Sequence, residues 1–272
     1  MSAPNAISPD KLLRLIGTSS CPQIIDLFDR PQLIPSSVCV SGDRIRSATG
    51  RFTNRPSVVV CNAGHERSQG IAAWLRHSGG EAEILEGGFS AWQAAGFPVV
   101  DPAKLPQRDS EGRTFWVTRS RPKVDRVACP WLIRRFVDPQ AVFLFVAPSE
   151  VEKVAEQFGG APFDVEGVFW SHRADHCTFD TMVEELGLGK FEALKRLSLI
   201  VRGADTARPE LAPQCAGLVA ASLGLSRMYS DDLEQLEAGM ILYDAFYRWC
   251  RDAVDETHDW VSHQPKAARQ HA

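Results

Sequence analysis

The turn from Cys61 to Ser68 constrains the fold of this chain more than any other stretch. An apolar run, residues 57–60, leads directly into Cys61 and has the composition of a buried strand. Residues 68–76 then carry apolar side chains at helical spacing, so strand, turn and helix follow one another without a spacer. Loop N–H groups and the helix N-terminus converge on one spot in such a unit, which makes it an anion cradle.

Cys61 is the candidate nucleophile of this cradle. The helix N-terminus favours negative charge and lowers the pKa of a cysteine from its free value near ~8.5, so we expect a thiolate. Arg67 adds a planar, permanently charged fork that can hold two oxygens of a tetrahedral oxyanion. Gly64 permits the backbone twist that aims the amides inward. This arrangement predicts group-transfer chemistry, with Cys61 and Arg67 as the catalytic residues.

The other residues of the turn are candidate substrate-binding residues: Asn62, Ala63, Gly64, His65, Glu66 and Ser68. His65 can serve as a proton donor, whereas the charge of Glu66 opposes an anion and suits a neutral or cationic acceptor. The competing interpretation is that Cys61 only ends a buried strand, because free cysteine behaves as a small hydrophobe. That interpretation requires cysteine, glycine, arginine and serine to occur together by coincidence.

The length, net charge and cysteine content of the chain limit the class of protein to which it can belong. A chain of 272 residues is long for one domain and predicts two. Its net charge is −4 with both signs interspersed, so we expect no membrane surface and no direct nucleic-acid binding. The start of the chain lacks a secretory signal, and no apolar run reaches about 18 residues. Seven cysteines at irregular spacings indicate reduced thiols, so we expect a cytoplasmic protein.

The first hundred residues alternate between strand-like and helix-like patterns. Predicted strands cover 23–29, 36–40, 57–60 and 81–85, and predicted helices cover 11–16, 68–76 and 89–95. Such alternation favours a parallel sheet flanked by helices, so the predicted fold class is α/β. We place this domain at 1–100, followed by a linker at 101–113 that is rich in proline and charge.

Three segments together resemble the rhodanese homology domain over about residues 8–100: the Cys61 turn, Leu85-Glu86-Gly87-Gly88-Phe89-Ser90-Ala91-Trp92 and Ala95-Gly96-Phe97-Pro98. The resemblance implies a sulfurtransferase that carries a persulfide on Cys61. Sulfur would come from a small sulfane donor and pass to a thiol acceptor, with no cofactor required. The resemblance also implies that loop amides and Arg67 hold the sulfonate part of the donor, and that Trp92 packs structurally.

The turn departs from the commonest rhodanese pattern in its length. In that family about six residues run from cysteine through arginine, whereas Cys61 through Arg67 spans seven. The longer turn resembles that of dual-specificity phosphatases and arsenate reductases, whose wider cradle admits phosphate or arsenate. An oxyanion phosphatase or an arsenate or chromate reductase is therefore an alternative to sulfur transfer.

The second half, placed at 114–256, is predicted to be a mostly helical α/β or α+β domain. Strands are expected at 114–118 and 141–146, and helices at 125–137, 148–158, 178–186, 191–202, 211–223 and 231–254. Asp125 is expected to cap the helix that it begins, with Pro130 confined to the first turn. The tail at 257–272 is expected to be disordered.

A second resemblance is carried by Asp125-Arg126-Val127-Ala128-Cys129-Pro130-Trp131-Leu132-Ile133-Arg134-Arg135-Phe136, by Val201-Arg202-Gly203-Ala204-Asp205-Thr206 and by Tyr243-Asp244-Ala245. These segments resemble the C-terminal domain of the ChrB chromate-resistance family over about residues 114–254. The resemblance implies a link to bacterial chromate resistance, in which some members are regulators. It assigns no catalytic residues.

The second half also contains candidate metal ligands. His172 and His176 would share one face of a helix, Cys177 follows directly, and Cys129 can complete the set. Imidazole and thiolate suit a zinc-like divalent transition metal, with Asp205 as a further ligand or orienter. We therefore predict a metal site at these residues, against the alternative of a polar loop. An oxyanion pocket is a further alternative, formed by Asp125, Arg126, Arg134, Arg135 and Arg202.

Three classes of function remain open from the sequence. A sulfurtransferase leads, followed by an oxyanion phosphatase or reductase and by a non-catalytic chromate or redox sensor that regulates a partner. A helix-turn-helix with a basic recognition face would favour a DNA-binding sensor, and the first half offers none. The sequence carries no indication of the oligomeric state.

Overall fold

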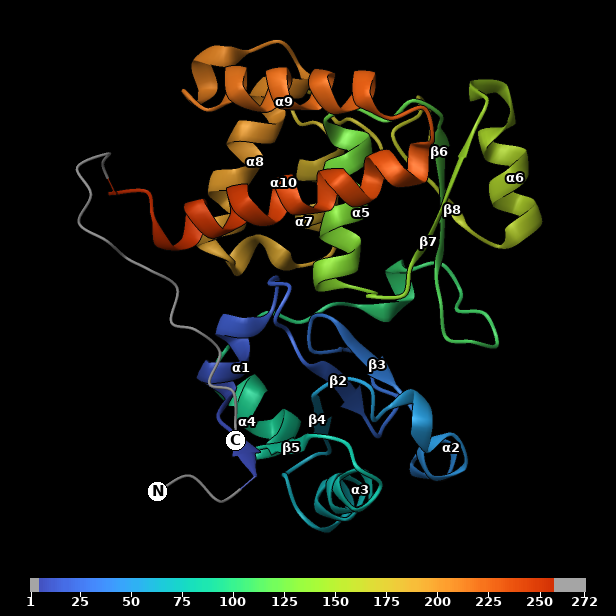
Figure 1. Ribbon diagram of the computed structural model, residues 1–272, viewed down its shortest axis with the longest axis vertical. Helices are drawn as coiled ribbons and strands as arrows, with labels where there is room; N and C mark the ends of the chain where they lie inside the picture. The colour runs from blue at the N-terminus through green and yellow to red at the C-terminus, as the bar shows by residue number, and fades with distance from the viewer. Residues whose placement is uncertain (1–4, 257–272) are drawn as a thin grey trace.

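The computed structural model describes residues 5–256, which form two β-sheets and the helices around them. The first sheet lies in the lower part of Figure 1 with the N-terminal helices. The second sheet lies above it, beside the helices of the C-terminal half. The predicted tail at 257–272 lies outside the described residues.

The first sheet has five parallel strands in the order β1-β5-β4-β2-β3. These are β1 (Ala6–Ile7), β2 (Gln23–Asp26), β3 (Ser37–Cys39), β4 (Ser57–Val60) and β5 (Ala82–Leu85). The neighbours of β4 cover both of its edges, and all four of its residues are buried, which suits its run of valines. Asp26 pairs in register with Val60, so β2 and β4 end together at the edge where Cys61 begins the turn.

Helices cover both faces of this sheet. They are α1 (Pro9–Leu15), α2 (Gly42–Ser47), α3 (Glu66–His77) and α4 (Gly88–Ala94). Val58 belongs to the buried cluster that contains Leu12 of α1 and Trp92 of α4, whereas Val59 belongs to the cluster that contains Ile71 of α3. Because successive strand residues point to opposite faces, α1 and α4 cover one face and α2 and α3 the other.

The second sheet has three parallel strands in the order β7-β6-β8. These are β6 (Phe115–Arg119), β7 (Val142–Val146) and β8 (Ala161–Pro162). The helices of this half are α5 (Asp125–Phe136), α6 (Val151–Phe158), α7 (Thr178–Glu185), α8 (Glu192–Asp205), α9 (Cys215–Met228) and α10 (Asp232–Asp252). Short 3-10 helices lie at Thr49–Arg51, Pro102–Lys104, Pro148–Glu150, Leu188–Lys190 and Pro209–Leu211.

α5 is the central helix of the second half. Trp131 is fully buried and contacts the rings of Phe136, Phe179, Tyr243 and Tyr247. Aromatic contacts of this kind add to the stabilisation from burying apolar area. The packing of α5 on its neighbours therefore holds the helix in place along most of its length.

The two halves share one continuous hydrophobic core. Ile16 and Ile24 of the first half belong to the same buried cluster as Phe136 of the second. Gly17 lies against the Phe136 ring, and the N–H of Ser36 donates to the Phe136 carbonyl at 2.6 Å. Further contacts across the junction are those of Lys190 Nζ with the Gly96 carbonyl and of Arg251 with the Arg14 carbonyl. The separation of the chain into domains at 101–113 stays a prediction.

The predicted α/β fold with a parallel sheet flanked by helices is confirmed, and the second half is mostly helical around a small parallel sheet. The sequence analysis missed β1, α2 and β8, which are short. Pro130 lies inside α5 beyond its first turn, which contradicts the predicted placement. Extensive burial of α5 offsets the hydrogen bond that proline removes from a helix interior.

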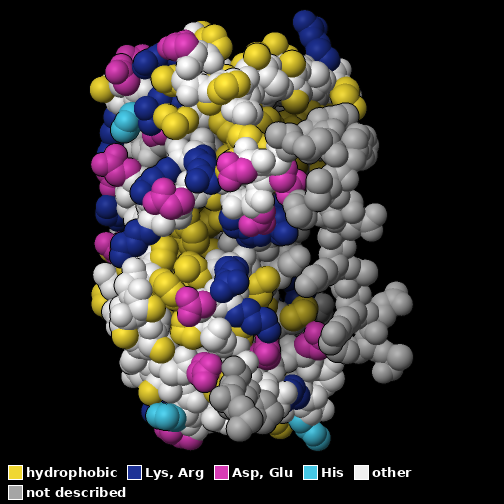
Figure 2. All heavy atoms as spheres, turned by 90° about the vertical axis from the view of Figure 1, so that its left-hand side faces the viewer, with side chains coloured by type: hydrophobic (Ala, Val, Ile, Leu, Met, Phe, Trp, Pro, Cys, Tyr) yellow, Lys and Arg dark blue, Asp and Glu magenta, His cyan; other side chains and the backbone are white. Residues whose placement is uncertain are grey.

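The described surface carries charges of both signs. Figure 2 shows Lys and Arg side chains beside Asp and Glu side chains across the middle of one face. Among residues 5–256, no helix combines the length and apolar character needed to cross a membrane.

We expect Gly17→Ala to lower the free energy of unfolding more than Gly79→Ala. Both glycines have positive φ, +83° and +88°, so both variants incur about 1–2 kcal/mol of backbone strain. A Cβ at Gly17 would lie 2.3 Å from the Phe136 ring, whereas a Cβ at Gly79 meets nothing within 4 Å. Overpacking should add about 1–3 kcal/mol at Gly17 alone. Urea denaturation measures the difference, and equal decreases in the free energy of unfolding of both variants would contradict the close contact between Gly17 and the Phe136 ring.

Candidate functional site

The Cys61 turn lies at the carboxyl edge of the first sheet, between the end of β4 and the start of α3. The Sγ atom of Cys61 is 3.1 Å from the Ser68 hydroxyl and accepts a hydrogen bond from the Gly64 N–H at 3.2 Å. Cys61 is 5% exposed and so lies at the base of the turn. The sulfur is therefore surrounded by donors from the turn itself.

Two opposing effects set the pKa of the Cys61 thiol. Burial raises it, but hydrogen bonds from the Ser68 hydroxyl and from the N–H groups of Ser68, Ala63 and His65 lower it by more. The net pKa lies below the ordinary value for cysteine. His65 is the N-cap of α3, so the positive end of that helix acts in the same direction. The geometry thus favours the thiolate, the form that is nucleophilic.

Two glycines allow the turn to close around the sulfur. Gly64 has φ +75°, and a Cβ there would lie 2.8 Å from the Leu85 carbonyl oxygen. Gly88, at the start of α4, has φ +60°, and a Cβ there would lie 2.4 Å from the Cys61 carbonyl oxygen. Both positions combine a left-handed backbone with close backbone neighbours, so only glycine fits them without displacement.

The other side chains of the turn line its outer rim. Asn62, His65, Glu66 and Arg67 are exposed, and Ala63 is half-buried. The Arg67 guanidinium lies 5.0 Å from the centre of the Phe28 ring. Within residues 5–256, Arg67 forms no ion pair. The rim therefore presents the permanent positive charge of Arg67, which no described carboxylate pairs with, beside the exposed carboxylate of Glu66.

Arg30 is a candidate site residue that the sequence analysis missed. Its Nε donates to Asp26 at 2.7 Å, and its Nη1 donates to the Asn62 side chain in the turn. The guanidinium also lies over the Phe89 ring at 4.6 Å. Its Nη2 atom is buried and has no hydrogen-bond partner among the described residues. The sequence offered one signal for this arginine. Asp26 is an acidic residue at the end of a buried strand beside β4, and such a residue needs a positively charged partner nearby.

The residues predicted to bind metal in the second half do not converge as a set. His176 is exposed and pairs through its backbone with Arg173 in a turn, so the two histidines share no helix face. Cys129 is buried in α5, and the Cys177 thiol donates to Asp180 at 3.2 Å. Burial raises the pKa of both thiols well above the ordinary value. Among residues 5–256, the possible ligand atoms that lie within 4.8 Å of one another belong to Asp125, Asp164 and His172, so we drop both sulfur ligands from the predicted site.

His172 instead faces three carboxylates. Its Nε2 atom lies 3.2 Å from Asp205, 3.3 Å from Asp164 and 3.5 Å from Asp125. The carboxylates of Asp125, Asp164 and Asp205 favour the charged imidazolium and raise the pKa of His172 to about 12. The sequence predicted that Asp125 caps its own helix, and this prediction is wrong. The Oδ2 atom of Asp125 instead accepts the N–H of Thr178 at the start of α7.

The arginines of the alternative oxyanion pocket do not gather in one place. Each of them has an acidic partner: Arg126 with Asp164, Arg134 with Glu237, Arg135 with Asp244 and Arg202 with Asp180. Their charges are therefore largely neutralised by ion pairs. This arrangement does not support the pocket that the sequence suggested.

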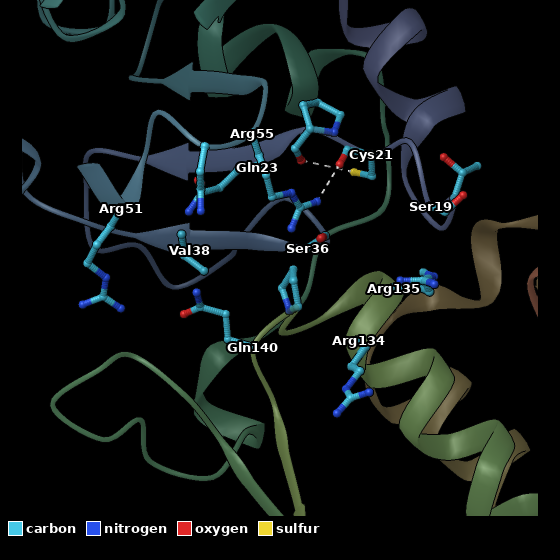
Figure 3. A pocket seen from close by; sticks show the side chains of 14 residues that line it. Ser19, Cys21, Gln23, Ser36, Val38, Arg51, Arg55, Arg134, Arg135 and Gln140 are labelled. Atoms are coloured by element: carbon cyan, nitrogen blue, oxygen red, sulfur yellow. Dashed lines mark hydrogen bonds between the residues drawn. The ribbon is translucent and has the colours of Figure 1, made fainter. Parts of the chain in front are cut away.

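Two of these arginines line a cavity of about 140 Å³ at the junction of the halves, shown in Figure 3. Arg51 and Arg55 line it from the first half, and Arg134 and Arg135 from the second. Cys21 also lines it, but burial raises the pKa of its thiol to about 12. Cys21 is therefore a poor nucleophile, and Cys61 remains the reactive candidate.

Comparison with known proteins identifies both halves. A model described as the rhodanese-like domain matches residues 8–95, and a model described as the ChrB C-terminal domain matches residues 116–250. The chain joins a rhodanese-like domain to a ChrB C-terminal domain. Protein ChrB of Cupriavidus metallidurans is 35% identical over 156 residues, which cover 56% of this chain and 46% of that protein. The chain thus matches about half the length of this curated relative.

Two solved structures are similar to about a third of this chain. A rhodanese-related protein from Thermoplasma volcanium is 22% identical, with a TM-score of 0.32 over 35% of this chain and 97% of its own. A rhodanese-like domain protein from Staphylococcus aureus is 28% identical, with a TM-score of 0.30 over 32% of this chain and 90% of its own.

In the rhodanese-like domain, we expect iodoacetamide to alkylate Cys61 at lower pH than Cys39. Cys39 is exposed, but partial burial together with Asp26 and Asp29 raises the pKa of its thiol. Ser68→Ala removes the hydroxyl beside Cys61 Sγ and should shift the alkylation midpoint upward by about one pH unit. Ser78→Ala, at the other end of α3, is the matched control. Peptide mass spectrometry across a pH series measures both midpoints, and an unchanged Cys61 midpoint in Ser68→Ala would refute this role of Ser68.

Proposed function

We propose that the rhodanese-like domain is a sulfurtransferase that carries a persulfide on Cys61. The observation that carries the proposal is the environment of the Cys61 sulfur, which contacts the Ser68 hydroxyl and the Gly64 N–H at the N-terminus of α3. These donors stabilise a thiolate before transfer and a terminal persulfide anion after it. The lowered pKa of Cys61 fits the same role.

The reaction requires only the thiolate, a donor and an acceptor. The Cys61 thiolate attacks the outer sulfur of thiosulfate, a new S–S bond forms, the S–S bond of thiosulfate breaks, and sulfite leaves with its electron pair. An acceptor thiolate then attacks the terminal sulfur, which regenerates the Cys61 thiolate and leaves a persulfide on the acceptor. Because sulfur moves without a resident cofactor, we propose that none is needed.

Arg67 and Arg30 are the groups proposed to hold the sulfonate of the donor. Arg67 lies at the exposed rim and forms no ion pair in the part of the chain described, so its guanidinium can donate hydrogen bonds to two sulfonate oxygens. Arg30 contacts the turn through Asn62 and has an unpartnered Nη2 atom. The amides of the turn would complete the oxyanion site.

We place this activity in chromate resistance because the ChrB-type domain follows the rhodanese-like domain on one chain. The partners proposed are a small sulfane donor and a thiol acceptor in the reducing environment of the cytoplasm. All seven cysteines lie among the described residues and are free thiols, which fits that compartment.

Hydrolysis of phosphate esters, or reduction of arsenate or chromate, is the second candidate function, and one observation favours it. The turn from Cys61 through Arg67 has seven residues, which gives a wider cradle than a six-residue turn. Phosphate-ester hydrolysis also needs a proton donor for the leaving group, and the turn offers only His65 and Glu66 on its exposed rim. Sulfur transfer needs no such donor, and so it leads.

The first test is sulfur transfer by Cys61→Ser. We expect wild-type protein to gain the mass of one sulfur atom after thiosulfate, to lose it on cyanide addition, and to release thiocyanate. Cys61→Ser should lose both signals, whereas Cys39→Ser, which changes an exposed thiol elsewhere, should keep them. Hydrolysis of aryl phosphates without persulfide formation would replace sulfur transfer by the phosphatase alternative. Absence of both activities in folded protein would favour the sensor alternative.

The second test separates charge from geometry at Arg67. Arg67→Lys keeps the positive charge but loses the two-pronged grip, so transition-state binding should weaken by about 1.5–3 kcal/mol. The reduction in kcat/KM for thiosulfate measures this loss. Arg46→Lys is the matched control, because Arg46 lines the same groove beside the turn but pairs with Asp43. Equal kcat/KM values in Arg67→Lys and wild type would exclude Arg67 from anion binding.

A further inference from the structure

Four segments of the ChrB-type domain bring ionisable side chains together around His172. Asp125 begins α5, Asp164 follows β8, His172 lies in the loop before α7, and Asp205 ends α8. Ligand atoms of Asp125, Asp164 and His172 all lie within 4.8 Å of one another. Asp125 and Asp164 are buried, and the His172 side chain is 41% exposed.

The distances within this cluster suit a shared ion better than hydrogen bonds. The Nε2 atom of His172 lies 3.2–3.5 Å from oxygens of Asp125, Asp164 and Asp205, and one N–H can point well at only one of them. Charge-assisted hydrogen bonds are shorter, about 2.7–2.9 Å. Ligands that lie about 2.1 Å from one metal ion are about 3.0–3.4 Å apart in octahedral or tetrahedral geometry.

Asp125 supplies an independent indication of a ligand. Its Oδ2 accepts the Thr178 N–H at 2.7 Å, and this bond fixes the carboxylate in the cluster. Its Oδ1 is buried and has no hydrogen-bond partner among residues 5–256, although the residue is only 1% exposed. A buried carboxylate oxygen left without a partner is costly, and a cation bound by both oxygens of the Asp125 carboxylate removes that cost. Oδ2 is the oxygen that lies near His172.

Neighbouring side chains hold the Asp164 carboxylate in place, as hydrogen-bond partners do for the ligands of a metal site. Its Oδ2 lies 2.9 Å from Arg119 and 3.2 Å from Arg126, and its Oδ1 accepts the Thr178 hydroxyl at 3.1 Å. Such contacts orient a carboxylate before an ion arrives. Three carboxylates face two guanidinium groups here, so one negative charge is left for a cation or for a protonated His172 to balance.

We propose that Asp125, Asp164 and His172, with Asp205 closing the site, bind one divalent transition-metal ion through oxygen and nitrogen. Carboxylate oxygens with one imidazole suit manganese, ferrous iron or zinc, whereas soft copper(I) prefers sulfur. The exposed edge of His172 gives the ion a path from solvent. The site is independent of sulfur transfer at Cys61, and it differs from the sulfur-containing set expected from the sequence.

The test uses the full-length protein, purified without an affinity tag and stripped with a chelator. Titration with Mn²⁺, followed by the loss of the free-ion electron paramagnetic resonance signal, should show one bound ion per chain. Asp125→Asn and His172→Ala should each abolish stoichiometric binding. His176→Ala and Cys177→Ser should bind Mn²⁺ as wild type does, since neither residue belongs to the site. Mn²⁺ should also raise the melting temperature of wild-type protein but not that of Asp125→Asn.

Three outcomes would overturn the proposal. Wild-type protein that binds neither Mn²⁺ nor Zn²⁺ at one per chain has no such site. Folded Asp125→Asn and His172→Ala that still bind as wild type does would place the ion elsewhere. Equal loss in His176→Ala or Cys177→Ser would return the ligands to the set expected from the sequence. Circular dichroism verifies folding, and Asp205→Asn at the rim of the site replaces any variant that does not fold.

Discussion

The close approach of two backbone segments at the carboxyl edge of the first sheet is the constraint on which the Cys61 site depends. The N–H groups of Phe89 and Ser90, in the first turn of α4, donate to the carbonyls of Cys61 and Asn62 at 2.9 Å each. These bonds direct the carbonyls of the turn toward α4, which leaves its amides free to point at the sulfur. Gly88 makes the approach possible, because a Cβ there would meet the Cys61 carbonyl oxygen. The conformation of the Cys61 turn thus depends on the start of α4 as much as on the residues of the turn itself.

The longer elements of the fold could be predicted because their patterns are local. The valines of β4 and the apolar spacing of α3 carry their own signal, and both elements lie within a few residues of the predicted bounds. β1 and β8 have two residues each, so only their pairing with β5 and β6 defines them. α2 contains one buried apolar residue, Ile45, and gave no period to detect. The shared core at Phe136 depends on contacts distant in sequence, which no local pattern reveals.

The two candidate sites differ in the same way. The Cys61 turn is contiguous, so its donors could be named from the sequence alone, and only Arg30 was missed. The cluster around His172 draws on segments up to eighty residues apart, from Asp125 to Asp205. Cysteine neighbours suggested sulfur ligands there, but among the described residues the ligand atoms that lie within 4.8 Å of one another belong to Asp125, Asp164 and His172. Side-chain type alone therefore indicated His172 and Asp205, but it did not indicate Asp125 and Asp164 as neighbours of His172.

Helix ends explain why charge gathers where it does in the ChrB-type domain. Burial raises the pKa of the Asp125 carboxyl to about 7. α5 begins at Asp125 and α7 begins at Thr178, whose N–H donates to the Asp125 carboxylate, so two positive helix ends act against this effect of burial. α8 ends at Asp205, so its negative end favours a cation beside it. The opposite end of α5 carries Phe136, whose carbonyl accepts the Ser36 N–H of the rhodanese-like domain. One buried helix thus positions a carboxylate of the His172 cluster at its start and fixes the junction of the two halves at its end.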